Sequence, residues 1–509
     1  MDDCDLLVVG GGINGAGIAR DAAGRGLTVV LCEQADLAAA TSSASSKLIH
    51  GGLRYLEQRE FRLVREALAE REVLLRSAPH IIRPLRFVLP HDPAIRPRWL
   101  VRLGLFLYDH IGGRRALPGT EAIRLRAHRY GAPLRPEIAH GFAYSDCRVD
   151  DARLVVLNAR AAAALGAAVL TRTRLIGARR DGGGWACRLR DRRSGCEREI
   201  RARALVNAAG PWVAEVIARV ASASSHRQMR LIKGSHIVVP RLHDGDQAYI
   251  LQNDDRRIVF VIPYQERFSL IGTTDVPFDG DPAAVAIAAD EIDYLCKAVS
   301  RWFATPVTPD QVLWRYAGVR PLYDDHAATA ATVTRDYVLD LDAPPGQAPL
   351  LSVFGGKITT FRRLAEHALD KLARFFPAAG PAWTRDAVLP GGDLPDGDVA
   401  RYATALTQSR PWLPAALAHR LAGSYGTAAA ALLGDAARHE DLGLEFGGGL
   451  TAREVDWLVA EEWALEPDDI LWRRTKLGLA IEPAGAERLR AYLAAKTAAT
   501  APAAQRSTA

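Results

Sequence analysis

Three glycines and one glutamate near the start of the chain have the spacing of a nucleotide-binding unit. The pattern G-x-G-x-x-G directly follows the apolar run 6–9, at Gly10, Gly12 and Gly15. Glu33 ends a second apolar run about 20 residues further on. Such glycines let a pyrophosphate approach bare backbone at a helix N-terminus, and the acid accepts hydrogen bonds from a ribose 2′-OH. The unit predicts an adenine dinucleotide without a 2′-phosphate, either FAD or NAD.

Three later stretches have residues suited to the rest of an extended cofactor. A hydroxyl-rich loop follows the nucleotide unit, and we expect it to contact the cofactor through Thr41, Ser42, Ser45, Ser46, Lys47, Leu48 and Gly51. A strand with a small-residue turn brings Gly210 beside the adenine half. A second strand, glycine turn and helix start repeats the anion-binding pattern at the far end of the cofactor, with Gly355, Gly356, Lys357 and Thr359.

The elements that must position these residues follow from periodicity. Residues 5–33 predict a βαβ unit, and 61–78 predict an amphipathic helix. Residues 174–191 predict a hairpin, 230–274 an antiparallel sheet and 283–303 a helix. After a linker at 390–393 the chain is helical, with a capping box at Thr451 and Glu454, and residues 497–509 form a disordered tail.

Composition limits the class of protein. The chain has 509 residues, 49% hydrophobic and 24% charged, with a net charge of +6, which is typical of a globular protein of two or three domains. Its 6 cysteines form no C-x-x-C pair, so we expect no metal site and a reducing cytoplasm. The first residues lead straight into a strand, and no apolar run approaches the length of a membrane span. We therefore expect neither a signal peptide nor a transmembrane segment.

One segment, 83–115, combines basic residues with an aromatic and leucine-rich stretch around Trp99 and Phe106. This pattern suits a helix lying on anionic lipid. A buried helix with snorkelling arginines explains it equally well. No basic stripe with regularly interleaved aromatics occurs, so we expect no nucleic-acid partner.

Ordered blocks along the chain resemble the FAD-dependent glycerol-3-phosphate dehydrogenase family, the aerobic respiratory enzyme of bacteria. They include GGGINGAGIARDAAGRG, ATSSASSKLIHGGLRYLE, LVNAAGPWV, RLIKGSHIVVP, YAGVRPL and LLSVFGGKITTFRRLAEHAL, and span residues 5–480. The resemblance implies an α/β fold: a Rossmann-like FAD-binding domain of the glutathione-reductase and D-amino-acid-oxidase kind, an antiparallel-sheet substrate domain and a C-terminal helical domain. We expect the FAD-binding domain at 1–74, 143–225 and 330–390, the substrate domain at 75–142 and 226–329, and the helical domain at 391–496.

The resemblance also implies an activity: oxidation of sn-glycerol 3-phosphate to dihydroxyacetone phosphate, with electrons passed to ubiquinone or menaquinone by a homodimer at the inner-membrane surface. An oxidase that uses O2, or another hydroxy- or amino-acid oxidoreductase on the same fold, is the alternative. A second alternative is a non-catalytic flavin-binding or nucleic-acid-binding protein with a vestigial site.

The same resemblance assigns residues to the substrate. The substrate-site residues it implies are Arg54, Tyr55, Arg320, Arg335 and Lys357. Arginine suits a phosphate because its planar fork gives bidentate bonds. His236 is the expected base, with Arg320 or Lys357 able to share that role, although a histidine on an apolar strand can also be a satisfied core residue.

Overall fold

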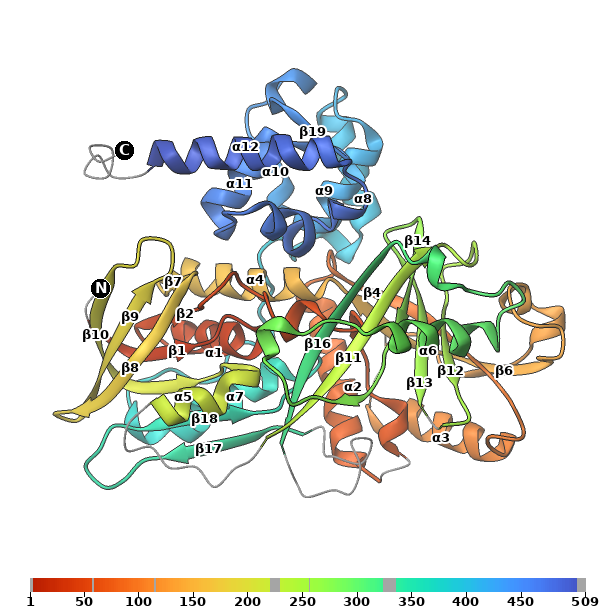
Figure 1. The fold of residues 1–509 in the computed structure, drawn as a ribbon, viewed down its shortest axis with the longest axis horizontal. Coiled ribbons are helices and arrows are strands. Elements are labelled where there is room, and N and C mark those ends of the chain that lie inside the picture. The colour runs from red at the N-terminus through yellow and green to blue at the C-terminus, as the bar shows by residue number, and fades with distance from the viewer. Residues whose placement is uncertain are drawn as a thin grey trace.

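The computed structural model describes residues 3–56, 59–113, 116–219, 229–255, 257–323 and 336–500, without the side chains of Arg54 and of residues 497–500. Two large sheets lie side by side, and a helical domain sits above both (Figure 1). The α-helices are α1 Ile13–Gly24, α2 Phe61–Ser77, α3 Arg98–Ile111, α4 Asp151–Ala164, α5 Val213–Arg219, α6 Ala289–Ser300, α7 Phe361–Leu372, α8 Val399–Ser409, α9 Ala415–Tyr425, α10 Ala428–Leu433, α11 Ala452–Glu462 and α12 Pro483–Thr500.

The first sheet has five parallel strands in the spatial order β7-β2-β1-β10-β18. They are β1 Asp3–Val9, β2 Val29–Cys32, β7 Ala168–Leu170, β10 Glu197–Asn207 and β18 Leu350–Phe354. β17 Val338–Asp342 and the hairpin of β8 Thr173–Asp181 and β9 Gly184–Asp191 complete it. Numbered along the chain, the parallel order is 3-2-1-4-5, in which a dinucleotide binds where the strand order reverses. The predicted βαβ unit and hairpin are confirmed.

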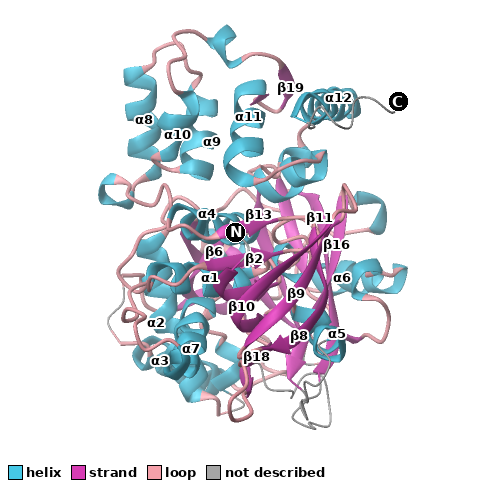
Figure 2. Cartoon of the chain, turned by 90° about the vertical axis from the view of Figure 1, so that its left-hand side faces the viewer, coloured by secondary structure: helices cyan, strands magenta, loops and turns pink. Residues whose placement is uncertain are grey.

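Helices cover the first sheet and create its core. α1 packs against α4 and α7, and Figure 2 shows α1 and α7 on the same side of the strands. Because β1 and β2 are buried on both faces, their sequences are continuous apolar runs instead of alternating ones.

The second sheet is mostly antiparallel. Its strands are β3 Leu48–Ile49, β4 Ile82–Pro90, β5 Glu121–Arg124, β6 His140–Val149, β11 Met229–Pro240, β12 Ala248–Gln252, β13 Ile258–Tyr264, β14 Phe268–Gly272, β15 Val276–Pro277 and β16 Trp314–Tyr323. The domain boundary expected at residue 143 falls inside β6, all of which pairs in this sheet. The helix expected from 283 begins at Ala289, after a short 3-10 turn.

The C-terminal domain contains α8 to α12, a π-helix at Asp469–Arg474 and a small ribbon of β19 Glu445–Gly447 and β20 Leu450–Thr451. It has its own apolar core. The predicted capping box is wrong: the Thr451 side chain makes no capping hydrogen bond, and buried Glu454 instead accepts from Arg420 and Tyr425. The tail expected from 497 is still helical to Thr500, and residues 501–509 lie outside the described residues.

Over the described ranges, every helix is too short or too polar to cross a bilayer.

Candidate active site

The first glycine turn has the geometry that a close approach to a pyrophosphate requires. Gly10 has φ +112°, and a Cβ there would lie 2.5 Å from the Ala208 carbonyl oxygen. A Cβ at Gly15 would lie 1.9 Å from the Gly10 oxygen. At Gly12 a Cβ would meet the Ser42 hydroxyl at 3.1 Å. The turn therefore has no room for a side chain at Gly10 or Gly15 and little room for one at Gly12.

Glu33 closes this turn from the end of β2. Its carboxylate accepts hydrogen bonds from the N–H groups of Gly11 at 2.6 Å and Ala35 at 2.8 Å. Burial raises the pKa of Glu33, against the lowering effect of these two bonds. Glu33 lies at the end of the strand, as the motif predicts, while its hydrogen bond to a ribose stays a prediction.

The hydroxyl-rich loop joins the two sheets. Ser42 Oγ accepts from the N–H of Ile13, the first residue of α1, at 3.0 Å. Thr41 Oγ1 donates to the Val319 carbonyl of β16 at 2.6 Å. Ser46 Oγ lies 2.9 Å from His236 Nε2 on β11. The loop is thus fixed both to the nucleotide turn and to two strands of the second sheet, β16 and β11.

Asp151, which the sequence reasoning did not single out, holds the same loop from α4. Its carboxylate accepts from Ser45 Oγ at 2.7 Å and from Lys47 Nζ at 2.9 Å. Lys47 Nζ also donates to the Ser43 carbonyl at 2.9 Å. Burial is the main cause of the lowered Lys47 pKa, and Asp151 opposes it. The ammonium is therefore held inside the protein, and its contact with a cofactor stays a prediction.

Three further residues expected at the cofactor, Leu48, Gly51 and Gly210, lie after this loop in the chain. Leu48 lies on β3, and the Gly51 N–H donates to Tyr108 Oη at 2.8 Å. A Cβ at Gly51 would lie 2.6 Å from a Leu68 methyl carbon, so glycine is needed for packing. Gly210 has φ +56°, a conformation that favours glycine.

The second glycine turn meets the first through Asn14. Gly355 and Gly356 have φ +78° and +100° after β18. Asn14 Nδ2 donates to the Gly355 carbonyl at 3.1 Å, while Asn14 Oδ1 is buried and has no hydrogen-bond partner among the described residues. Thr359 Oγ1 accepts from the His50 N–H at 3.3 Å. Two glycine turns without side chains, together with a buried amide oxygen that lacks a hydrogen-bond partner among the described residues, fit an extended dinucleotide such as FAD. Asn14 occupies an unrestricted position of the glycine motif, so the pattern could not reveal it.

His236 and Arg320 lie together on the second sheet. His236 is 3% exposed and its ring stacks on Tyr316, with centroids 4.8 Å apart. Burial, followed by the charges of Lys47 and Arg320, holds the His236 pKa well below its usual value. Arg320 pairs with Asp275 at 2.7 Å and donates to the Thr274 carbonyl at 2.6 Å. The imidazole is therefore held neutral, by burial and partly by the charge of the Arg320 guanidinium.

The remaining expected substrate residues are only partly described. Lys357 Nζ lies 3.8 Å from the centroid of the Tyr55 ring. The Arg54 backbone belongs to a 3-10 helix at Leu53–Leu56, and its side chain is not described. Arg335 lies outside the described residues. The assembly of all five residues around one substrate stays a prediction.

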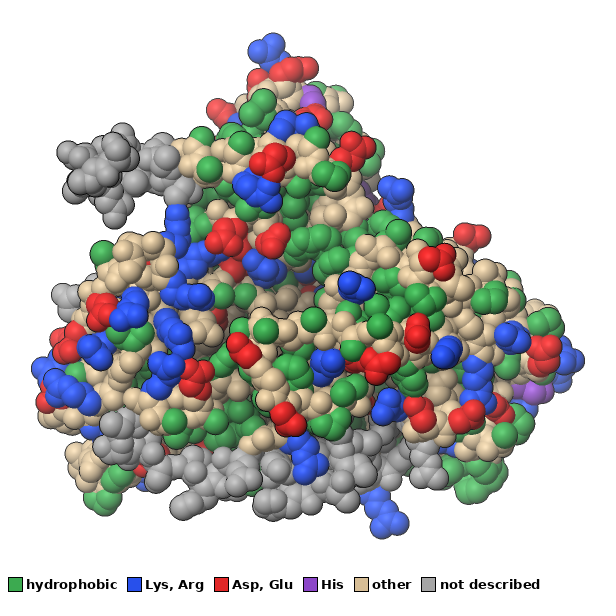
Figure 3. Space-filling model, in the orientation of Figure 1, with side chains coloured by type: hydrophobic (Ala, Val, Ile, Leu, Met, Phe, Trp, Pro, Cys, Tyr) green, Lys and Arg blue, Asp and Glu red, His purple; other side chains and the backbone are tan. Residues whose placement is uncertain are grey.

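A separate basic groove of about 460 Å³ occurs on β8, β9 and α5. Arginines gather over this hairpin at the left of Figure 3, and those lining the groove are Arg174, Arg188, Arg190, Arg192 and Arg219. Arg174 and Arg219 pair with Glu215, and Arg190 with Glu197. These two carboxylates offset part of the charge of the five arginines, and the groove has none of the site residues above.

Known protein families match this chain in two parts, which correspond to the two-sheet region and to the C-terminal helical domain. The family described as FAD dependent oxidoreductase matches residues 5–362, and the family described as C-terminal domain of alpha-glycerophosphate oxidase matches residues 382–498. A glycerol-3-phosphate dehydrogenase of Pseudomonas aeruginosa is 57% identical over 96% of this chain and 94% of its own. The aerobic glycerol-3-phosphate dehydrogenase of Escherichia coli is 54% identical over 94% and 95%. A D-erythritol 1-phosphate dehydrogenase of Brucella abortus is 55% identical over 93% and 94%.

Solved structures show the same fold. A glycerol-3-phosphate dehydrogenase of Bacillus halodurans complexed with FAD has a TM-score of 0.75 at 28% identity, over 93% of this chain and 86% of that one. An L-alpha-glycerophosphate oxidase of Mycoplasma pneumoniae has a TM-score of 0.60 at 18% identity, over 77% and 100%. The cofactor is FAD, and the expected fold class is confirmed. The chain belongs to the family of FAD-dependent oxidoreductases.

Proposed function

We propose that this protein oxidises sn-glycerol 3-phosphate at C2 to dihydroxyacetone phosphate. The observation that carries the proposal is the match, at 54–57% identity over nearly the whole chain, to glycerol-3-phosphate dehydrogenases of two bacteria. FAD, when bound, supplies the hydride acceptor. The protein has to bind a dianion and accept the hydroxyl proton, and the described site contains a group for each task.

Arg320 is suited to the phosphate, and His236 to the proton. The imidazole is kept neutral by burial and by the charges of Lys47 and Arg320, so a nitrogen is free of a proton and can accept one. A phosphate bound at Arg320 would cancel part of that positive charge. Binding of the substrate would therefore raise the pKa of His236, and make it a better base when it is needed.

D-erythritol 1-phosphate is a second candidate substrate, because the Brucella relative is as similar as the others. Both compounds place a secondary alcohol near a phosphate, and they differ in the length of the polyol. The cations therefore do not distinguish them. The space in the site beyond the reacting carbon is what would distinguish the two substrates.

The proposed electron acceptor is ubiquinone or menaquinone at the inner-membrane surface, where the protein binds peripherally. The support is helix α3, whose exposed apolar residues lie beside Arg98 and Arg102: Trp99 is 67% exposed, Leu100 45%, Leu103 46% and Phe106 55%. Single exposed apolar residues are common, but four on one helix indicate a contact surface. The homodimer stays a prediction.

The test is anaerobic absorbance of the purified holoenzyme. We expect glycerol 3-phosphate to bleach the oxidised-flavin band near about 450 nm, while glycerol and lactate leave it unchanged. A faster and tighter response to D-erythritol 1-phosphate would assign the second substrate. A flavin that stays oxidised with both phosphates would contradict the proposal. Reoxidation by a quinone analogue compared with O2 then separates a dehydrogenase from an oxidase.

A further inference from the structure

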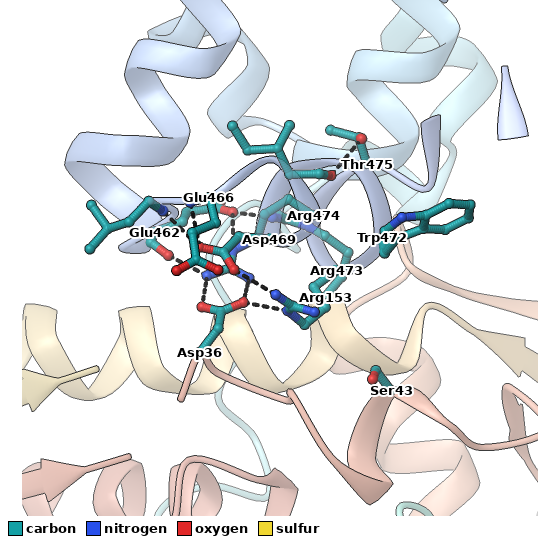
Figure 4. A network of polar contacts seen from close by, with 12 residues as sticks. Asp36, Ser43, Arg153, Glu462, Glu466, Asp469, Trp472, Arg473, Arg474 and Thr475 are labelled. Atoms are coloured by element: carbon teal, nitrogen blue, oxygen red, sulfur yellow. Dashed lines mark hydrogen bonds and ion pairs between the residues drawn. The ribbon is translucent and has the colours of Figure 1, made fainter. Parts of the chain in front are cut away.

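The C-terminal domain places charged residues directly against the cofactor-binding domain. Its π-helix ends in Arg473 and Arg474, and both guanidiniums bind Asp36 in the close-up of Figure 4. Arg474 is fully buried and donates to Asp36 at 2.7 and 2.8 Å, and Arg473 donates at 2.6 Å. Asp36 follows Glu33 by three residues, so this network holds the segment after β2 against the C-terminal domain.

A second contact continues from this domain into the hydroxyl-rich loop. Lys476 is 4% exposed, and its Nζ lies 3.4 Å from Asp150 and 3.8 Å from Asp151. Asp151 in turn binds Lys47 and Ser45, as described above. Lys476 also has φ +60°, a conformation that costs energy for a residue with a Cβ and that the surrounding contacts must maintain.

An aromatic stack makes a third connection. Trp472 of the π-helix stacks on Trp314 of β16, with centroids 4.4 Å apart and planes 11° apart. Trp314 lies 5.0 Å from Tyr316, which lies 4.8 Å from His236. Tyr316 Oη donates to the Ser45 carbonyl at 2.7 Å, so the ionic and aromatic routes meet at Tyr316.

We propose that the C-terminal domain is a positioning element for the reaction, with Lys476 and Trp472 as positioning residues that act on the hydroxyl-rich loop and on His236. Both side chains act through other residues and not on the substrate itself. Lys476 Nζ donates to the Trp472 carbonyl at 2.7 Å, and its charge supports Asp150 and Asp151 and through them the loop. Trp472 acts through Trp314 on the plane of Tyr316, on which the imidazole stacks. This inference rests on the proposed function for its effect on rate, and on FAD binding alone for its effect on the loop.

If these residues position the catalytic groups, their replacement should lower the reaction rate more than the loss of an ordinary surface contact does. Small displacements of a catalytic group lower the rate by up to about 100-fold. We expect Lys476→Met to raise the FAD dissociation constant about tenfold and to lower the limiting rate of anaerobic flavin reduction by about 10-fold to 100-fold. Trp472→Ala should lower that rate with little change in KM. Trp472→Phe, which keeps a ring against Trp314, should restore most of it.

Glu461→Gln is the matched control, since it removes a domain-interface ion pair with Arg160 at 3.2 Å that does not reach the loop. All variants are compared as holoenzymes whose thermal unfolding is first checked. If Lys476→Met and Trp472→Ala both match Glu461→Gln in FAD affinity and reduction rate, the proposal is overturned. It is equally overturned if all three lose function alike, because the cause is then general loosening of the interface. If the parent enzyme is not reduced by either polyol phosphate, the proposed function fails, and the FAD dissociation constants still decide the effect on the loop.

Discussion

His236 combines properties that a core histidine and a catalytic base share only in part. Both can be buried, and both can be neutral. The buried Nδ1 of His236 does not distinguish the two: it has no hydrogen-bond partner among the described residues, and the same is true there of both ring nitrogens of His80 and His243. What sets His236 apart is its Nε2, which meets Ser46, a residue of the loop that the glycine motif leads into. This arrangement favours the catalytic reading.

Replacement of this imidazole should affect chemistry more than binding. We expect His236→Gln to lower the limiting rate of flavin reduction by about 10²- to 10⁴-fold, the usual contribution of a general base, with KM for the phosphorylated substrate nearly unchanged. Anaerobic stopped-flow absorbance measures both quantities.

His243→Gln is the matched control, because His243 is also buried and its pKa is also lowered, to about 4. Its ring packs on Tyr249 instead of Tyr316. That variant should be reduced at the parent rate. A His236→Gln enzyme reduced within threefold of the parent would remove His236 from the mechanism and leave Lys357 or Arg320 as candidates.

At the residue scale, the sequence predicted the residues whose position follows from a local sequence motif. The glycines of the first turn and Glu33 could be found because the motif itself fixes their geometry. Asp151 could not, since its partners Lys47 and Lys476 are distant in the chain and only the fold brings them together. The Lys47 ammonium is bound by Asp151, because a buried charge needs a partner, and the contact of Lys47 with the cofactor stays a prediction.

At the scale of elements, periodicity predicted what local pattern determines: the βαβ unit, the hairpin of β8 and β9, and helix α2. The assignment of β6 to the second sheet depends on its pairing with β3, β4 and β5, which no local pattern encodes. The capping box failed for a similar reason, because Glu454 has stronger partners in Arg420 and Tyr425 than a helix N-terminus offers.

Helix α3 permits a direct test of the lipid-binding interpretation. We expect Trp99→Ser combined with Phe106→Ser to lower binding to vesicles containing anionic lipid at least tenfold, because two of the most exposed apolar side chains of the helix are lost. Cosedimentation of the holoenzyme with vesicles measures this.

Leu444→Ser is the control, since Leu444 is 64% exposed on the C-terminal domain and belongs to no such helix. Flavin reduction in solution should stay the same in both proteins, which separates binding from catalysis. Equal vesicle binding by the α3 variant and its parent would show that this helix does not contact lipid.

At the scale of the whole molecule, buried neutral histidines make the free energy of unfolding depend on pH. Burial lowers the pKa of His80 to about 3 and that of His243 to about 4, and His236 also lies well below its usual value. Unfolding returns each to about 6.5, so the unfolded chain binds more protons below that pH. These groups therefore leave stability unchanged above pH about 6.5 and reduce it as the pH falls. Buried Asp21 and Glu33, whose pKa values are raised, act in the opposite direction.

A difference between two proteins isolates one histidine from these opposing carboxyl groups. Between pH about 6 and 5, His243 should contribute about 1.2 kcal/mol of lost unfolding free energy, because most of one proton is taken up on unfolding. The His243→Gln variant lacks that proton uptake. Its stability should therefore fall less steeply with acid than that of the parent, although it is the less stable protein at pH 7.5. Denaturant unfolding of both holoenzymes at pH 7.5, 6.0 and 5.0 measures the two slopes. Parallel slopes would mean that His243 already carries its proton in the folded protein, and that the Arg241 charge and burial do not keep it neutral.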